Sequence, residues 1–103
     1  MFKLDQNRTF KAKVPIPVPG ASKDAILEFD FIFKDRDQIK DFMESLPSRE
    51  DDESLQEIVC GWKDVDAEFS PESFTKLLKN YPGAARAILD KYLAEVSVSK
   101  TKN

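Results

Sequence analysis

Two stretches of alternating apolar and polar residues, separated by a proline–glycine turn, constrain the fold more than any other feature of this sequence. Each stretch carries an apolar side chain at every second position, and the second is rich in phenylalanine: Phe10, Ala12, Val14, Ile16 and Val18, then Leu27, Phe29, Phe31 and Phe33. A period of two is typical of a β-strand with one buried face. Pro19 and Gly20 between the stretches are a turn signal. The pattern therefore predicts a β-hairpin over about residues 8–34.

The prolines of the first stretch indicate its place in a sheet. Pro15, Pro17 and Pro19 occupy its polar positions, and proline has no N–H to donate to a neighbouring strand. We therefore expect an edge strand. A two-stranded ribbon is not stable alone in water, so the Phe-rich face must be covered by the segments that follow. Ile26 and Ile32 lie on the opposite, charged face, where they are either shielded by the fold or exposed for a partner.

Helical periodicity begins after the second stretch. Apolar residues recur three and four positions apart in four segments, which predicts four short amphipathic helices. The first begins with a capping box of Asp35 and Gln38 and ends at Pro47. Ser70 caps the third, with Pro71 at its first position, and Pro82 opens the fourth.

The segment between the first and third helices is acidic and then apolar. Glu50–Glu53 predicts a solvated linker, because it lacks the spacing and the glycine of a calcium-binding loop. Ser54 with Glu57 predicts the cap of the second helix, whose apolar stripe comprises Leu55, Ile58, Val59 and Trp62. Cys60 is expected to be a small buried residue, and the Trp62 N–H to bond a nearby carbonyl.

These elements together predict one domain over residues 1–103. The fold class is α+β, with an N-terminal β-hairpin packed on three or four short amphipathic helices. The hairpin covers about residues 8–34, the helical part about residues 35–97, and a polar tail residues 98–103.

Composition argues against catalysis and metal binding. The 103 residues include no histidine, the commonest general base and metal ligand, and one cysteine, too few for a disulfide or a thiolate zinc site. The three glycines are isolated, so a phosphate-binding loop is not expected. Glu53-Ser54 is similar to the phosphopantetheine site of acyl carrier proteins, but a helix cap explains Ser54. We predict a protein that is not an enzyme and needs no cofactor and no metal.

Charge and hydropathy limit the partners. Asp and Glu total 19 against 16 Lys and Arg, giving a net charge of -3, which argues against nucleic-acid binding. No stretch approaches the roughly 20 apolar residues of a membrane span, and the first residues lack the apolar core of a signal peptide, so a cytoplasmic protein is expected. An acidic inhibitor or antitoxin that masks a basic partner remains one hypothesis, with the carboxylates of residues 50–57 and 64–72 as its contacts.

The second half carries a recognisable order of residues. The run from Gly61 to Ser70 (GWKDVDAEFS) is followed by Phe74, Leu77, Leu78, Tyr81, Pro82, Ala85, Ile88, Tyr92 and Leu93. This order, over residues 57–103, resembles that of phage tail assembly chaperones. We interpret the signature residues as determinants of the fold: Gly61, Trp62, Val65, Phe69, Tyr81 and Pro82.

The resemblance implies a function. Proteins of this family bind the tape-measure protein in the bacterial host cytoplasm, keep it soluble until the tail tube polymerises, and are absent from the virion. The tail tube protein is a second implied partner, and a homo-oligomer is implied as well. An amphipathic helix in an apolar groove is the expected mode of recognition. Candidate contact residues are apolar side chains expected to meet solvent: Ile26, Ile32, Tyr92 and Val96.

Overall fold

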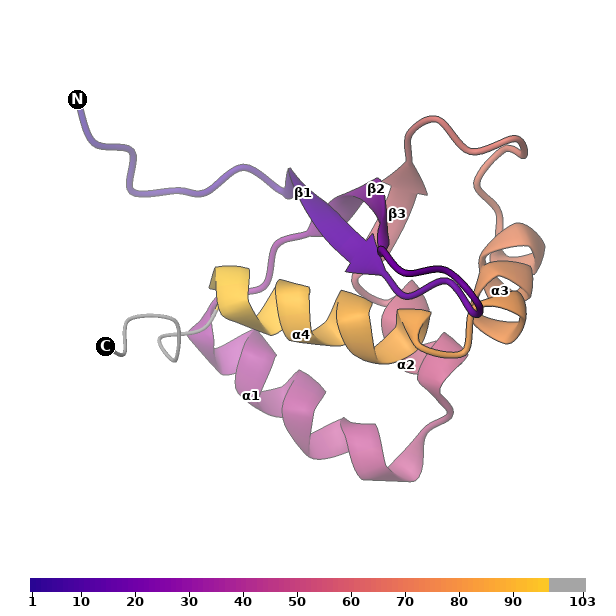
Figure 1. Ribbon diagram of the computed structural model, residues 1–103. Coiled ribbons are helices and arrows are strands. Elements are labelled where there is room, and N and C mark those ends of the chain that lie inside the picture. Colours follow the sequence, from indigo (N-terminus) through magenta and orange to yellow (C-terminus); the bar gives the residue numbers. More distant parts are fainter. Residues whose placement is uncertain (97–103) are drawn as a thin grey trace.

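A three-stranded antiparallel sheet and four α-helices form the α+β fold, confirming the predicted class (Figure 1). The computed structural model describes residues 1–96, so the predicted tail and residue 97 lie outside the described residues. The elements are β1 (Thr9–Ile16), β2 (Ala25–Ile32), α1 (Arg36–Ser45), the 3₁₀ turn η1 (Leu46–Ser48), α2 (Asp51–Gln56), β3 (Val59–Trp62), α3 (Pro71–Asn80) and α4 (Ala84–Val96).

The hairpin forms as predicted, with β1 at an edge of the sheet in the order β1-β2-β3. Its inner face pairs apolar residues and is buried, as at Ala12 opposite Phe29. The outer face pairs Lys11 with Asp30, at 2.6 Å between Nζ and Oδ1, and places Pro15 opposite Ile26. The period of two therefore divides the sheet into an apolar inner face and a largely charged outer face.

The predicted second helix is wrong in its position, and of its stripe residues only Leu55 is helical. α2 begins four residues earlier than expected, because its N-cap is Glu50 and not Ser54. Glu50 and Glu53 form its capping box, and the expected linker supplies its acidic first turn. The chain then leaves the helix and pairs Val59–Trp62 with β2. This pairing fills backbone hydrogen bonds that β2 would otherwise leave open, and it outweighs the helical spacing of the side chains. Cys60 lies on this strand and is exposed, contrary to expectation.

The other helix starts are close to expectation. The capping box of Asp35 and Gln38 begins α1, and Ser70 caps α3 with Pro71 at the first position. α4 begins at Ala84, so Pro82 lies in the preceding turn instead of opening the helix. In that turn a Cβ on Gly83 would lie 2.9 Å from the Pro17 ring, so the hairpin tip packs closely against the α3–α4 turn.

Aromatic rings fill the core between the sheet and the helices. Tyr92 is completely buried, with its ring centroid 5.4 Å from that of Phe31 and 6.2 Å from that of Phe42. Its hydroxyl donates to the carbonyl of Ile32 at 2.7 Å. The expectation that Tyr92 lies at a solvent-facing position is therefore wrong, because the last helix turns this residue towards the centre of the aromatic cluster.

Candidate functional site

An apolar groove of about 650 Å³ lies between the hairpin tip, the loop of residues 63–70 and α3. We call it the tip groove. Its apolar lining comes from both sides of the hairpin tip, β3, the loop and α3, and includes Ile16, Val18, Ile26, Leu27, Trp62, Val65, Leu77 and Tyr81. Asp64, Asp66 and Lys76 also line it, so charged groups accompany the apolar surface. A volume of this size lies within the usual range of ligand pockets, roughly 300–1,000 Å³.

Ile26 is the most exposed of these apolar side chains, with 63% of its surface accessible. It lies near the tip end of β2, opposite Pro15 across the hairpin. A single exposed isoleucine is ordinary, but one that lines the same groove as a tryptophan and a tyrosine adds to a continuous apolar surface.

The loop that forms one wall of the groove is held by side-chain contacts. The Trp62 indole N–H donates to the carbonyl of Ala67 at 2.9 Å, as predicted for that group. Phe69 packs edge-on against the Trp62 ring at 5.2 Å, and the Ser73 hydroxyl donates to the Glu68 carbonyl at 2.7 Å. Asp64 adopts a left-handed conformation with φ 61°, which aspartate tolerates better than most residues. The wall of the groove is thus built before any partner arrives.

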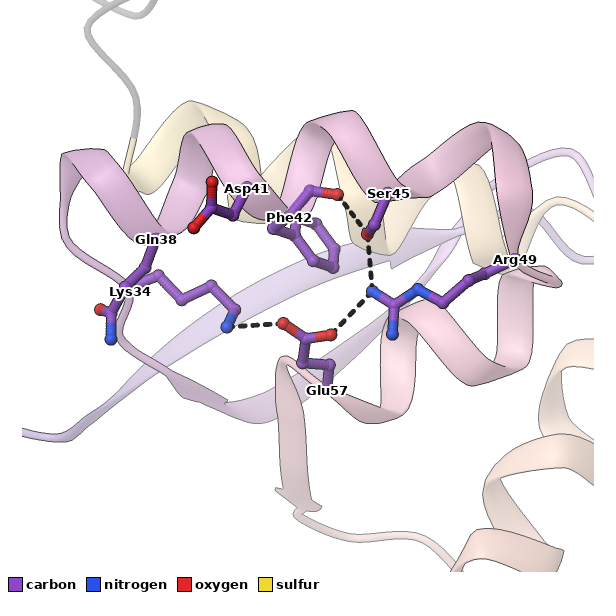
Figure 2. A pocket seen from close by; sticks show the side chains of 7 residues that line it. All are labelled: Lys34, Gln38, Asp41, Phe42, Ser45, Arg49 and Glu57. Atoms are coloured by element: carbon purple, nitrogen blue, oxygen red, sulfur yellow. Dashed lines mark hydrogen bonds and ion pairs between the residues drawn. The ribbon is translucent and has the colours of Figure 1, made fainter.

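A second depression, of about 410 Å³, has a different character (Figure 2). We call it the ionic pocket, lined by Lys34, Gln38, Asp41, Phe42, Ser45, Arg49 and Glu57. The Glu57 carboxylate lies between two cations, 2.7 Å from the Lys34 Nζ and 2.7 Å from the Arg49 Nη2. Arg49 also donates to the Ser45 hydroxyl at 2.9 Å. Both cations lie within 6.0 Å of the centroid of the Phe42 ring.

Glu57 pairs with both cations of the ionic pocket, whereas the buried Arg49 Nε has no hydrogen-bond partner among the described residues. The pKa of Glu57 is lowered, first by the hydrogen bond from Lys34 and also by Arg49. The Gln38 side-chain oxygen is occupied by the cap of α1, where it accepts from the Asp35 backbone N–H at 2.9 Å. The Glu57 contacts join the residue after α2 to the segments on both sides of α1, and we interpret them as a structural brace.

The four candidate contact residues do not form one surface. Ile26 lines the tip groove, whereas Ile32 is half-buried six positions away on β2, roughly 20 Å along the strand. Val96 is half-buried and lines a separate cavity of about 280 Å³ with Phe10 and Phe33. Tyr92 is in the core. Only Ile26 of the four therefore belongs to the groove.

Three signature residues join Ile26 in the groove, namely Trp62, Val65 and Tyr81. Of the others, Phe69 supports the Trp62 ring, Gly61 leaves room for the Asp30 carboxylate, and Pro82 is exposed. Leu27 and Leu77 also line the groove but were not among the predicted contact residues, since Leu27 was expected on the buried face of the hairpin. The one available signal was Val65, an apolar residue within an acidic, non-helical segment.

Metal and membrane signals are lacking in the part of the chain that the structure describes. Within residues 1–96, no group of three or more histidine, cysteine, aspartate or glutamate side chains is arranged to hold a metal ion. Among the helices described there, none combines the length and apolar character needed to cross a bilayer.

Comparison with known proteins identifies a family. A family model described as phage tail assembly chaperone matches residues 1–103, the whole length of the sequence. No curated protein and no solved structure matches this chain.

Proposed function

This chain belongs to the phage tail assembly chaperone family, and we propose that it binds the tape-measure protein and keeps it soluble until the tail tube polymerises. The observation that carries the proposal is the family match over the whole chain. The family indicates a non-catalytic role. We also propose that it acts in the bacterial host cytoplasm and is absent from the virion. The tail tube protein is its proposed second partner.

The tip groove supports this function as the client-binding surface. A long helical client with an apolar stripe presents side chains one turn apart, which an apolar groove accommodates. Ile26, Trp62 and Leu77 supply apolar contacts from three separate segments. The loop of residues 63–70 is already held by its hydrogen bonds, so little ordering is needed on binding.

The proposed function also requires release of the client. Interfaces that bury less than about 1,200 Å² are characteristic of weak or transient complexes. A chaperone must give up its client when tube subunits arrive, so modest affinity at each groove is an advantage. Several copies along one client would raise the overall affinity by avidity.

Co-expression with the tape-measure protein tests the proposal. We expect the tape-measure protein to stay soluble and to co-purify with the wild-type chain, and to lose both properties with the variant Ile26→Ser/Val65→Ser. Met43→Ser is the matched control, because Met43 is 47% exposed on α1 and does not line the tip groove. An insoluble, unbound tape-measure protein beside well-folded wild-type chain would contradict the proposal.

The acidic inhibitor or antitoxin hypothesis has less support. Glu50 and Glu53 are used in the cap of α2, and Glu57 is paired with Lys34 and Arg49. A charge-driven complex should weaken steeply with salt, whereas binding through the groove should not. Measuring client affinity between low and high salt therefore separates the two hypotheses.

A further inference from the structure

A small pocket of about 190 Å³ lies between α2 and α4, beside the 3₁₀ turn η1. We call it the α2–α4 pocket. Leu46, Leu55, Ala85 and Leu89 give it an apolar lining. It shares no lining residue with the tip groove or the ionic pocket. Its volume is below the roughly 300–1,000 Å³ of pockets that hold a whole small molecule, so it is suited to a single side chain.

One buried hydroxyl belongs to this pocket. Ser54 lines it and is 3% exposed, and the Ser54 Oγ has no hydrogen-bond partner among the described residues. The sequence predicted that Ser54 caps α2, but the cap is Glu50, so the hydroxyl is not used at the helix terminus. Most buried polar groups of native proteins are hydrogen-bonded, because an unpaired one costs free energy. The Ser54 hydroxyl is therefore free to accept a hydrogen bond from a donor that enters the pocket.

The uncompensated charge of the pocket is negative. Asp51 lies three residues before Ser54, on the same face of α2, and it forms no ion pair within residues 1–96. The basic residue of the lining, Arg86, is already bound, since its Nε donates to both carboxylate oxygens of Asp90 at 3.1 and 3.2 Å. Because Asp90 offsets the charge of Arg86, the pocket favours a cation beside Asp51.

We propose that the α2–α4 pocket binds a lysine side chain of a partner protein. The aliphatic stem of the lysine lies against the apolar lining, and its ammonium donates to the Asp51 carboxylate and the Ser54 Oγ. A compact ammonium with three donors suits two separate acceptors, whereas the planar guanidinium of arginine suits bidentate contacts. The Ser54 Oγ is shielded in the free chain, so binding includes a rotamer change of the lining side chains, as is common at interfaces. The proposal does not depend on the identity of the client.

An NMR titration of the isotope-labelled chain with the peptide acetyl-Ala-Ala-Lys-Ala-Ala-amide tests the proposal. The matched peptide carries norleucine in place of lysine, which keeps the stem and removes the ammonium. We expect the lysine peptide to shift the amide signals of Ser54, Leu55 and Leu89, and to bind about five-fold more tightly than the norleucine peptide. Asp51→Asn and Ser54→Ala should each weaken binding of the lysine peptide about five-fold. Asp66→Asn, in the tip groove, is the control and should leave it unchanged.

Thermal unfolding of Ser54→Ala separates binding from a structural role. Alanine removes an unpaired buried hydroxyl and favours the helix, so the midpoint of unfolding should rise while the affinity for the peptide falls. Any of four results overturns the proposal: pocket signals that do not shift, a norleucine peptide that binds as tightly as the lysine peptide, an Asp51→Asn or Ser54→Ala chain that binds as wild type does, or a Ser54→Ala chain that is unfolded or has a lower midpoint. In the last case the hydroxyl serves the fold.

Discussion

The ionic pocket and the tip groove are both hollows on the surface of this small protein, and they differ in what their lining groups already contact. In the ionic pocket, Glu57 holds Lys34 and Arg49, and Phe42 lies beneath both cations. In the tip groove, Ile26 is exposed and the half-buried Leu77 and Tyr81 line the open space. We interpret a hollow whose central carboxylate is already paired with two cations as structural, and one with uncovered apolar groups as a binding surface.

The largest expected effect on stability comes from the floor of the ionic pocket. Phe42 is 2% exposed and contacts Tyr92 in the core. Replacing it with alanine should lower the free energy of unfolding by about 3–5 kcal/mol, measured by denaturant titration. A loss below about 1 kcal/mol would mean that the pocket is not anchored to the core.

Removing the carboxylate at the centre of the brace should have the next largest effect. Glu57→Gln leaves two partly buried cations without a counter-charge, and we expect a loss of about 2 kcal/mol at neutral pH. Glu44→Gln on the exposed side of α1 is the control, with little change expected.

The same variant also tests how the free energy of unfolding depends on pH. The folded pKa of Glu57 lies below its ordinary value of 4.5, so folding favours the ionised carboxylate. Its stabilisation is complete above that value and is lost as the pH falls through the lowered folded pKa. Wild-type stability should therefore approach that of Glu57→Gln below pH 4.5. If the difference in free energy of unfolding between wild type and Glu57→Gln stays constant with pH, the Glu57 contacts do not stabilise the fold in the way proposed.

Tyr92→Phe should have a smaller effect. The substitution keeps the ring but leaves the Ile32 carbonyl without its 2.7 Å hydrogen bond, at a cost of about 1 kcal/mol. Client capture should not change, because Tyr92 is buried. If Tyr92→Phe captures less client while its free energy of unfolding is unchanged, Tyr92 contacts the client after all.

The smallest effect on stability is expected in the groove. Ile26→Ser removes an exposed side chain and should change the free energy of unfolding by less than about 0.5 kcal/mol, while it weakens client capture. Unfolding curves and pull-downs on the same preparation give both quantities. Equal capture by Ile26→Ser and Met43→Ser would remove Ile26 from the binding surface.

Local signals in the sequence predicted the elements whose stabilising contacts are local. The hairpin follows from its alternation, and α1 and α3 follow from caps at Asp35 and Ser70. β3 could not be predicted in this way, because a four-residue strand is decided by the open edge of β2, which is distant in sequence.

The candidate site was only partly predictable for the same reason. The tip groove combines Ile26, Trp62, Val65 and Tyr81 from different segments, and their proximity depends on the register of β3. A stripe of apolar residues on a helix likewise does not reveal which members reach the centre of the core. Tyr92 does so, whereas Leu77 on α3 remains half-buried at the groove.

Amide hydrogen exchange of the chain, with and without bound tape-measure protein, tests the central claim most directly. We expect new protection at residues 62–67 and 76–81 around the tip groove, with exchange at residues 34–49 around the ionic pocket unchanged. Protection confined to residues 34–49, with the groove exchanging as in the free chain, would contradict the assignment of binding to the groove.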